Sequence, residues 1–65
     1  MSLEFIRYHY DVPAKRGGRI RYTGGEQPRE GTITSAKGGS LMVRFDGDKH
    51  AYKLHPTWKI EYLHE

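Results

Sequence analysis

The sequence predicts an all-β fold in which five short strands curl into a small barrel behind an extended N-terminal arm. Apolar and polar residues alternate over several short segments, as in strands with one buried face. Tight glycine turns separate these segments, and the 65-residue chain offers no convincing amphipathic helix. We expect a barrel because closure removes the exposed edges that an open five-stranded sheet leaves.

The arm is expected to span residues 1–13, and the barrel residues 14–65. Ile6, Tyr8 and Tyr10 alternate with polar residues, which favours an extended conformation. Pro13 ends the arm, since the residue before a proline is biased toward extended geometry. A basic loop of residues 14–18 then leads into the barrel.

The first two strands are expected at residues 19–23 and 32–36. Ile20 and Tyr22 point inward from the first strand and Ile33 from the second, because successive side chains of a strand face opposite sides. The loop between them contains two glycines and a proline, which are typical of turns.

Three further strands are expected at residues 41–46, 49–54 and 59–63. The adjacent Gly38 and Gly39 allow the positive φ of a hairpin turn, and Asp46-Gly47 is a second turn signal. The side chains expected to point inward are Leu41, Val43, Phe45, Tyr52, Leu54, Ile60 and either Tyr62 or Leu63.

The last connection, residues 55–58, contains Pro56 and is expected to form a single helical turn. Trp58 in this turn is expected to join the core. The chain has eight aromatic residues, more than a core of this size hides, so at least two tyrosines should reach the surface.

Composition restricts the classes of function. The chain has no cysteine, which excludes disulfides and thiolate zinc sites. No apolar run reaches the roughly 20 residues of a membrane span and no signal pattern appears, so we expect a soluble cytoplasmic protein without a membrane partner. The net charge is +3, and the positive charge is concentrated in residues 15–37. This distribution suggests an anionic partner, although a solubilising surface is the alternative.

The basic residues are the best binding candidates, since lysine and arginine contact phosphates. Strand parity places part of this set on one outward face, and the rest lies in adjoining loops. The predicted nucleic-acid-binding residues are Arg19, Arg21, Arg44 and Lys53 on the face, and Lys15, Arg16 and Lys37 in the loops.

A second set supplies apolar or stacking surface and consists of Tyr8, Tyr10, Met42 and Trp58. These side chains could stack on bases beside the basic residues. Alternatively, they could anchor a protein partner, either a bound peptide or a second copy of the chain.

The strand order and loops resemble an SH3-like barrel over roughly residues 14–63. Residues 18–25 followed by Gly31-Thr32-Ile33 are similar to the KOW motif, although the motif's second glycine falls near Arg29. This resemblance implies RNA or protein partners. Tudor-like and chromo-like modules share the same barrel, and a fold alone does not determine a function.

The chain also resembles, more distantly, the plasmid-borne type II dihydrofolate reductases, which are SH3-like barrels with one active pore in a tetramer. The catalytic segment of that family is Val-Gln-Ile-Tyr before a proline, whereas this chain has Tyr52-Lys53-Leu54-His55 before Pro56. The glutamine and isoleucine that hold the ligands are missing, so we expect no enzyme activity, with an oligomeric reductase as the alternative.

No catalytic, cofactor or metal motif is present in the sequence. The four histidines, His9, His50, His55 and His64, lack the spacing of zinc ligands. Asp46 and Asp48 flank a glycine like part of a calcium loop, but the following ligands are missing, which favours a turn. We therefore expect a non-catalytic binding module without a cofactor.

Overall fold

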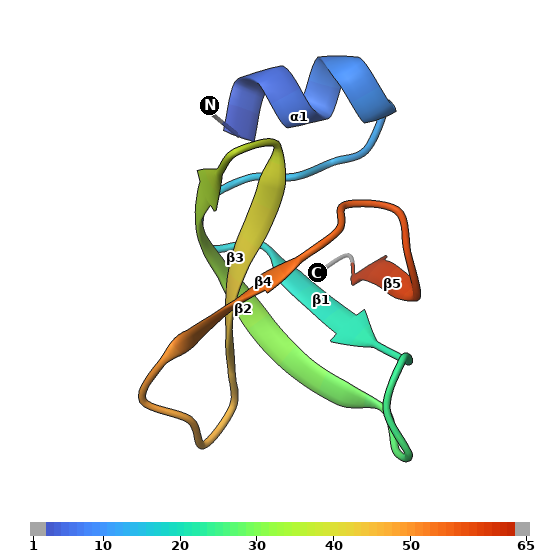
Figure 1. The fold of residues 1–65 in the computed structure, drawn as a ribbon, viewed down its shortest axis with the longest axis vertical. Coiled ribbons are helices and arrows are strands. Elements are labelled where there is room, and N and C mark those ends of the chain that lie inside the picture. The colour runs from blue at the N-terminus through green and yellow to red at the C-terminus, as the bar shows by residue number, and fades with distance from the viewer. Residues whose placement is uncertain (1–2, 64–65) are drawn as a thin grey trace.

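The computed structural model describes residues 3–63 as one five-stranded antiparallel sheet with a short helix across one end (Figure 1). The five predicted strands are confirmed. The elements are α1 (Leu3–Tyr10), β1 (Arg19–Tyr22), β2 (Arg29–Lys37), β3 (Ser40–Phe45), β4 (Ala51–Leu54) and β5 (Ile60–Leu63). No helix of residues 3–63 is long and apolar enough to cross a membrane.

The strands lie in the order β4-β3-β2-β1-β5, so β5 pairs with β1 at the far edge from β4. Only residues 55–59 connect β4 to β5. A connection this short joins opposite edges when the sheet is strongly curled, and Figure 1 shows β4 turned across the sheet toward β5. Within the described residues β4 and β5 do not pair, so a fully closed barrel stays a prediction.

The prediction of an extended N-terminal arm is wrong, because Leu3–Tyr10 forms helix α1. Leu3, Ile6 and Tyr10 have helical spacing and all pack on the core, with Ile6 fully buried. Tyr8, which the alternating pattern grouped with Ile6, is 82% exposed. The helix ends at Tyr10, and the next residue, Asp11, has a φ of 55° that turns the chain out of the helical path.

The core lies between α1 and the concave face of the sheet. The inward orientation predicted for Ile20, Ile33, Leu41, Val43 and Phe45 is confirmed, since all five side chains are buried. Ile6 and Ala14 complete the buried apolar set. The two glycines of the β2–β3 turn have φ values of 57° and 82°, as the hairpin prediction requires.

Gly31 on β2 lies opposite Ile20 of β1 on one side and opposite Phe45 of β3 on the other. A Cβ at this position would lie 2.8 Å from the Arg44 carbonyl oxygen and 2.8 Å from Val43 Cγ1. Glycine therefore allows β2 and β3 to approach closely at this position.

The prediction that Trp58 belongs to the core is wrong, since it is 54% exposed. Tyr52 lies opposite the buried Val43 and so faces inward as predicted, but it remains 48% exposed. Tyr52 lies on β4, an edge strand, and contacts Phe45 from one side with their ring centroids 5.9 Å apart. Trp58 lies in the β4–β5 connection, in which Pro56 rather than Trp58 is buried. That connection is a turn rather than the predicted helical turn.

Candidate functional site

The strand register places the predicted basic residues of the sheet on its outer face. Arg19 pairs with Thr32, which pairs in turn with Arg44, while Met42 pairs with Lys53. Paired residues point to the same side of a sheet, and these positions alternate with the buried ones. The outward orientation of Arg19, Arg21, Arg44 and Lys53 follows from this register.

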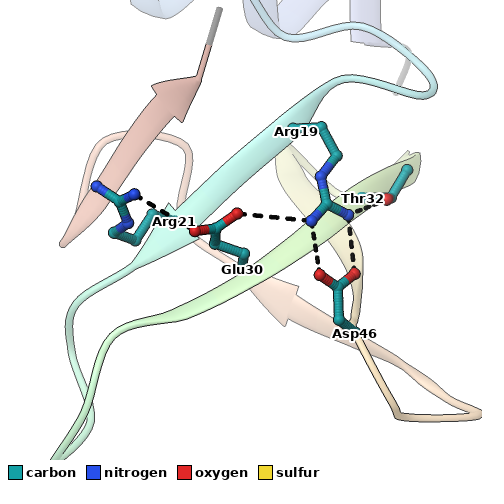
Figure 2. Close-up of polar contacts among 5 residues, drawn as sticks. All are labelled: Arg19, Arg21, Glu30, Thr32 and Asp46. Carbon is teal, nitrogen blue, oxygen red and sulfur yellow. Dashed lines mark hydrogen bonds and ion pairs between the residues drawn. The ribbon is translucent and has the colours of Figure 1, made fainter. Parts of the chain in front are cut away.

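The same register brings carboxylates to this face. Glu30 and Glu61 lie on either side of Arg21, with closest nitrogen–oxygen distances of 3.3 and 3.5 Å. Arg19 donates two hydrogen bonds to Asp46, of 2.8 and 2.6 Å, and a third of 2.8 Å to Thr32. Figure 2 shows Glu30 between the two arginines, 3.6 Å from Arg19.

This arrangement is an ion-pair network rather than an open cationic patch. The hydrogen bonds from Arg19 lower the pKa of Asp46 below its ordinary value of 3.8, because they stabilise the ionised carboxylate. Sequence reasoning missed the network because it assigned Glu30 to a loop, whereas β2 already begins at Arg29. Strand alternation could have revealed it, because Glu30 lies two residues before Thr32 and residues two apart in a strand face the same side.

A separate basic region lines a cleft of about 770 Å³ between the helix–strand linker and the β1–β5 pair. Among residues 3–63, four of its lining residues are lysine or arginine, and none is acidic. The lining residues are Arg7, Pro13, Lys15, Arg16, Gly17, Gly18, Arg19, Tyr62 and Leu63. We call this feature the basic cleft.

The loop that carries Lys15 and Arg16 is a tight turn fastened to the sheet. The Gly18 N–H donates to the Lys15 carbonyl at 3.0 Å, and Gly17 has the φ of 82° typical of the third residue of a type II turn. Gly17 and Gly18 also exchange backbone hydrogen bonds of 2.9 Å with Ile33. The backbone is therefore held in place, while the exposed Lys15 and Arg16 side chains extend from a corner.

Two further arginines are held at the cleft by their own contacts. Arg7 of α1 donates a 2.7 Å hydrogen bond to the Ala14 carbonyl, which fixes its guanidinium beside the linker. Arg19 reaches the cleft from β1 while paired with Asp46. Among residues 3–63, Lys15 and Arg16 make no ion pair, so their charges are available to a ligand.

The walls contributed by Pro13, Tyr62 and Leu63 are uncharged. The Tyr62 hydroxyl donates a 2.7 Å hydrogen bond to the Pro56 carbonyl. Burial raises the pKa of Tyr62 from 10 to about 12, because the charged phenolate is disfavoured where water is excluded. The cleft therefore combines mobile cations with partly apolar walls.

The structure brings only part of the predicted basic set together. Lys15, Arg16 and Arg19 line the cleft, whereas Lys37 lies at the β2 end of the hairpin turn, outside its lining. Arg44 and Lys53 are on the outer face, also outside the lining. Sequence reasoning missed Arg7, because the extended arm hid its position on a helix beside the linker.

The predicted stacking residues do not gather. Tyr8 is exposed on α1, Tyr10 packs against His55 at 5.3 Å between ring centroids, and Met42 lies on the outer face. Trp58 instead lies next to Tyr22, with ring centroids 6.2 Å apart. Tyr22 lies 6.0 Å from Phe45, and Phe45 lies 5.9 Å from Tyr52. This aromatic row consists of Trp58, Tyr22, Phe45 and Tyr52.

Two cations of the described residues already lie on the aromatic row, Lys59 with its Nζ 6.0 Å from the Trp58 ring centroid and Arg29 over Phe45. The Arg29 guanidinium carbon is 4.4 Å from the Phe45 ring centroid, and Arg29 also pairs with Asp48 at 2.7 Å. Asp48 and Asp46 thus both serve as ion-pair partners in the turn after β3.

Residues 3–63 contain no group of three histidine, aspartate or glutamate side chains that could hold a metal ion. His9 stacks on Phe5 at 5.1 Å, and His55 Nδ1 accepts a 3.1 Å hydrogen bond from the Thr57 N–H inside its turn. His64 lies outside the described residues.

Comparison of the chain with protein families, with curated proteins and with solved structures finds no match in any of the three.

Proposed function

We propose that this protein is a non-catalytic module of the SH3-like, KOW-like type that contacts nucleic-acid phosphates through its basic cleft. The observation that carries the proposal is the pair Lys15 and Arg16 in the basic cleft, where the described residues supply neither an ion-pair partner for them nor an acidic lining residue. The curled five-strand sheet, with β5 returning to β1, supports the barrel type.

Phosphate binding needs cations that are free to replace counterions. Each lysine or arginine that neutralises a phosphate releases counterions, which makes the affinity steeply dependent on salt. The Lys15–Gly18 turn holds its backbone in place before any ligand arrives, so only side chains need to be ordered on binding. Arg7 would add fixed positive charge nearby.

The outer strand face fits phosphate less well than the cleft. Arg19 and Arg21 already have carboxylate partners, and a phosphate must compete with Asp46, Glu30 and Glu61 for them. Arg44 and Lys53 add charge at a distance, which favours association without fixing a site.

The test is fluorescence anisotropy with single- and double-stranded oligonucleotides at about 50 mM and about 200 mM salt. The Lys15→Gln/Arg16→Gln variant should bind at least about tenfold more weakly and lower the salt slope by about 2. The matched control Lys37→Gln/Lys53→Gln removes the same charge outside the cleft and should change the affinity less than about threefold.

Equal losses in the two variants would mean that net charge alone governs binding, which contradicts the assignment to the cleft. Absence of binding by the unmodified protein at tens of micromolar would remove the nucleic-acid proposal altogether.

The aromatic row favours a protein partner as the second candidate. Trp58 and Tyr52, at its two ends, are about half exposed, and exposed aromatic side chains are enriched where proteins meet. A protein partner bound here should be retained at about 500 mM salt, because burial of apolar surface is not screened. Capture that survives Lys15→Gln/Arg16→Gln but fails in Trp58→Ala/Tyr52→Ala would support this candidate.

A further inference from the structure

The basic cleft has enough room for a nucleotide, and its concave shape does not fit the surface of a duplex. Its volume of about 770 Å³ falls within the range of about 300–1,000 Å³ that encloses small ligands. Its walls come from α1, from the linker and from both strands of the β1–β5 pair. A duplex presents its phosphates on a convex surface, which such a concave site does not match.

The charge of the cleft suits a terminal phosphate better than an internal one. A phosphomonoester carries about −1.5 to −2 charges at pH 7, whereas each internal phosphodiester carries one. Lys15 and Arg16 have no ion-pair partner within residues 3–63, and the guanidinium of Arg7 is fixed by its hydrogen bond to the Ala14 carbonyl. The three positive charges of Lys15, Arg16 and Arg7 exceed the single negative charge of a phosphodiester and are closer to that of a phosphomonoester.

The uncharged walls provide a place for the remainder of a nucleotide. Pro13 and Leu63 are apolar, and the Tyr62 hydroxyl is occupied by its hydrogen bond to the Pro56 carbonyl. Sugar and base atoms can pack on these walls while the phosphate contacts the cations at the rim. A site lined only by lysine and arginine would show no preference for a nucleotide over inorganic phosphate.

We propose that the basic cleft binds a nucleoside phosphomonoester, supplied by the phosphorylated end of a single strand. This inference rests on the proposed function, because the same Lys15 and Arg16 contact the phosphate. It goes further by assigning the ligand to a strand end, with the terminal nucleotide inside the cleft and the following phosphates outside it.

The experiment uses an internally labelled hexathymidylate with a 5′ phosphate, with a 3′ phosphate or with neither. We expect one of the phosphorylated strands to bind about tenfold more tightly than the unphosphorylated strand, the effect of one added charge-assisted hydrogen bond. This preference should decline below about pH 6, where the monoester dianion takes up one proton and becomes a monoanion. Thymidine monophosphate should compete for the site, and inorganic phosphate should compete more weakly.

The control variant Leu63→Trp reduces the space in the cleft without changing its charge. It should lose the preference for the phosphorylated strand and keep weak, salt-dependent binding, with circular dichroism to verify the fold. If this variant does not fold, amide chemical shifts of the unmodified protein decide: thymidine monophosphate should shift Gly17 and Gly18 and leave Gly38 and Gly39 unchanged.

The outcomes separate this inference from the proposed function. Equal affinity for all three strands, together with loss of binding in Lys15→Gln/Arg16→Gln, overturns the strand-end site and leaves the phosphate-binding module in place. Absence of binding by every strand overturns both. Monophosphate binding as tight as that of the phosphorylated strand supports the site and identifies its ligand as a free nucleotide.

Discussion

Arg19 and Asp46 form a two-point ion pair, in which Nη1 and Nη2 of the arginine donate to Oδ1 and Oδ2 of the aspartate at 2.8 and 2.6 Å. Arg19 lies on β1, and Asp46 follows the last residue of β3. The pair spans β2, since Arg19 also donates to Thr32 on that strand (Figure 2). This contact ties three neighbouring strands together on the outer face.

The pair predicts a loss of stability in acid. The hydrogen bonds from Arg19 hold the pKa of Asp46 below its ordinary value of 3.8, so the stabilising contribution is present above 3.8 and is lost as the pH falls through the lower, folded-state pKa. Asp46→Asn should lower the urea midpoint at pH 7, and the gap to the unmodified protein should close in acid. The control is Glu26→Gln in the exposed β1–β2 loop, and an identical pH profile for both variants would contradict the prediction.

Strand parity made the outward face of Arg19 and Arg21 predictable from the sequence, because a strand with Ile20 and Tyr22 inward leaves no other orientation. The neutralising carboxylates were not predictable in the same way. Their contacts depend on which residues of neighbouring strands lie opposite one another, and that register is a tertiary property. Glu61 meets Arg21 only because β5 returns to pair with β1.

The N-terminal segment shows how a short pattern can satisfy two periods. Ile6, Tyr8 and Tyr10 alternate, while Leu3, Ile6 and Tyr10 have helical spacing, and eight residues are too few to separate the two. The need to cover one end of the core with Ile6 selects the helix. The helical conformation also places Arg7 at the basic cleft. Predicting an extended arm therefore led to both errors, the missing helix and the missing cleft residue.

Helix α1 should be essential to the stability of the sheet. Ile6→Ala removes a fully buried side chain and should cost about 2–5 kcal/mol. For a domain of this size, that is a large part of the free energy of unfolding. Tyr8→Ala changes the same helix at a position that is 82% exposed and should cost less than about 0.5 kcal/mol, measured by urea denaturation. Equal effects of the two changes would mean that α1 does not pack on the sheet.

Gly31 should not tolerate a side chain. The added Cβ of Gly31→Ala meets the Arg44 carbonyl oxygen at 2.8 Å and the Phe45 Cα at 3.0 Å, and backbone atoms cannot rotate away. We expect a loss of about 1–3 kcal/mol in the free energy of unfolding. In Gly25→Ala the nearest atom is the Gln27 carbonyl oxygen at 4.0 Å, so this control should unfold at nearly the same urea concentration as the unmodified protein. A neutral Gly31→Ala would show that β2 and β3 can separate at this point.

Tyr62 should make the protein sensitive to alkali. Its hydroxyl donates to the Pro56 carbonyl at 2.7 Å, and burial raises its pKa from 10 to about 12. Because the unfolded chain loses this proton first, the contribution of Tyr62 is fully present below pH 10 and is lost between about pH 10 and 12. Tyr62→Phe should cost about 1 kcal/mol at pH 8 and show a smaller loss of stability above pH 10. Tyr8→Phe is the exposed control, and parallel urea-midpoint profiles for Tyr62→Phe and Tyr8→Phe from pH 8 to pH 11 would disprove the assignment.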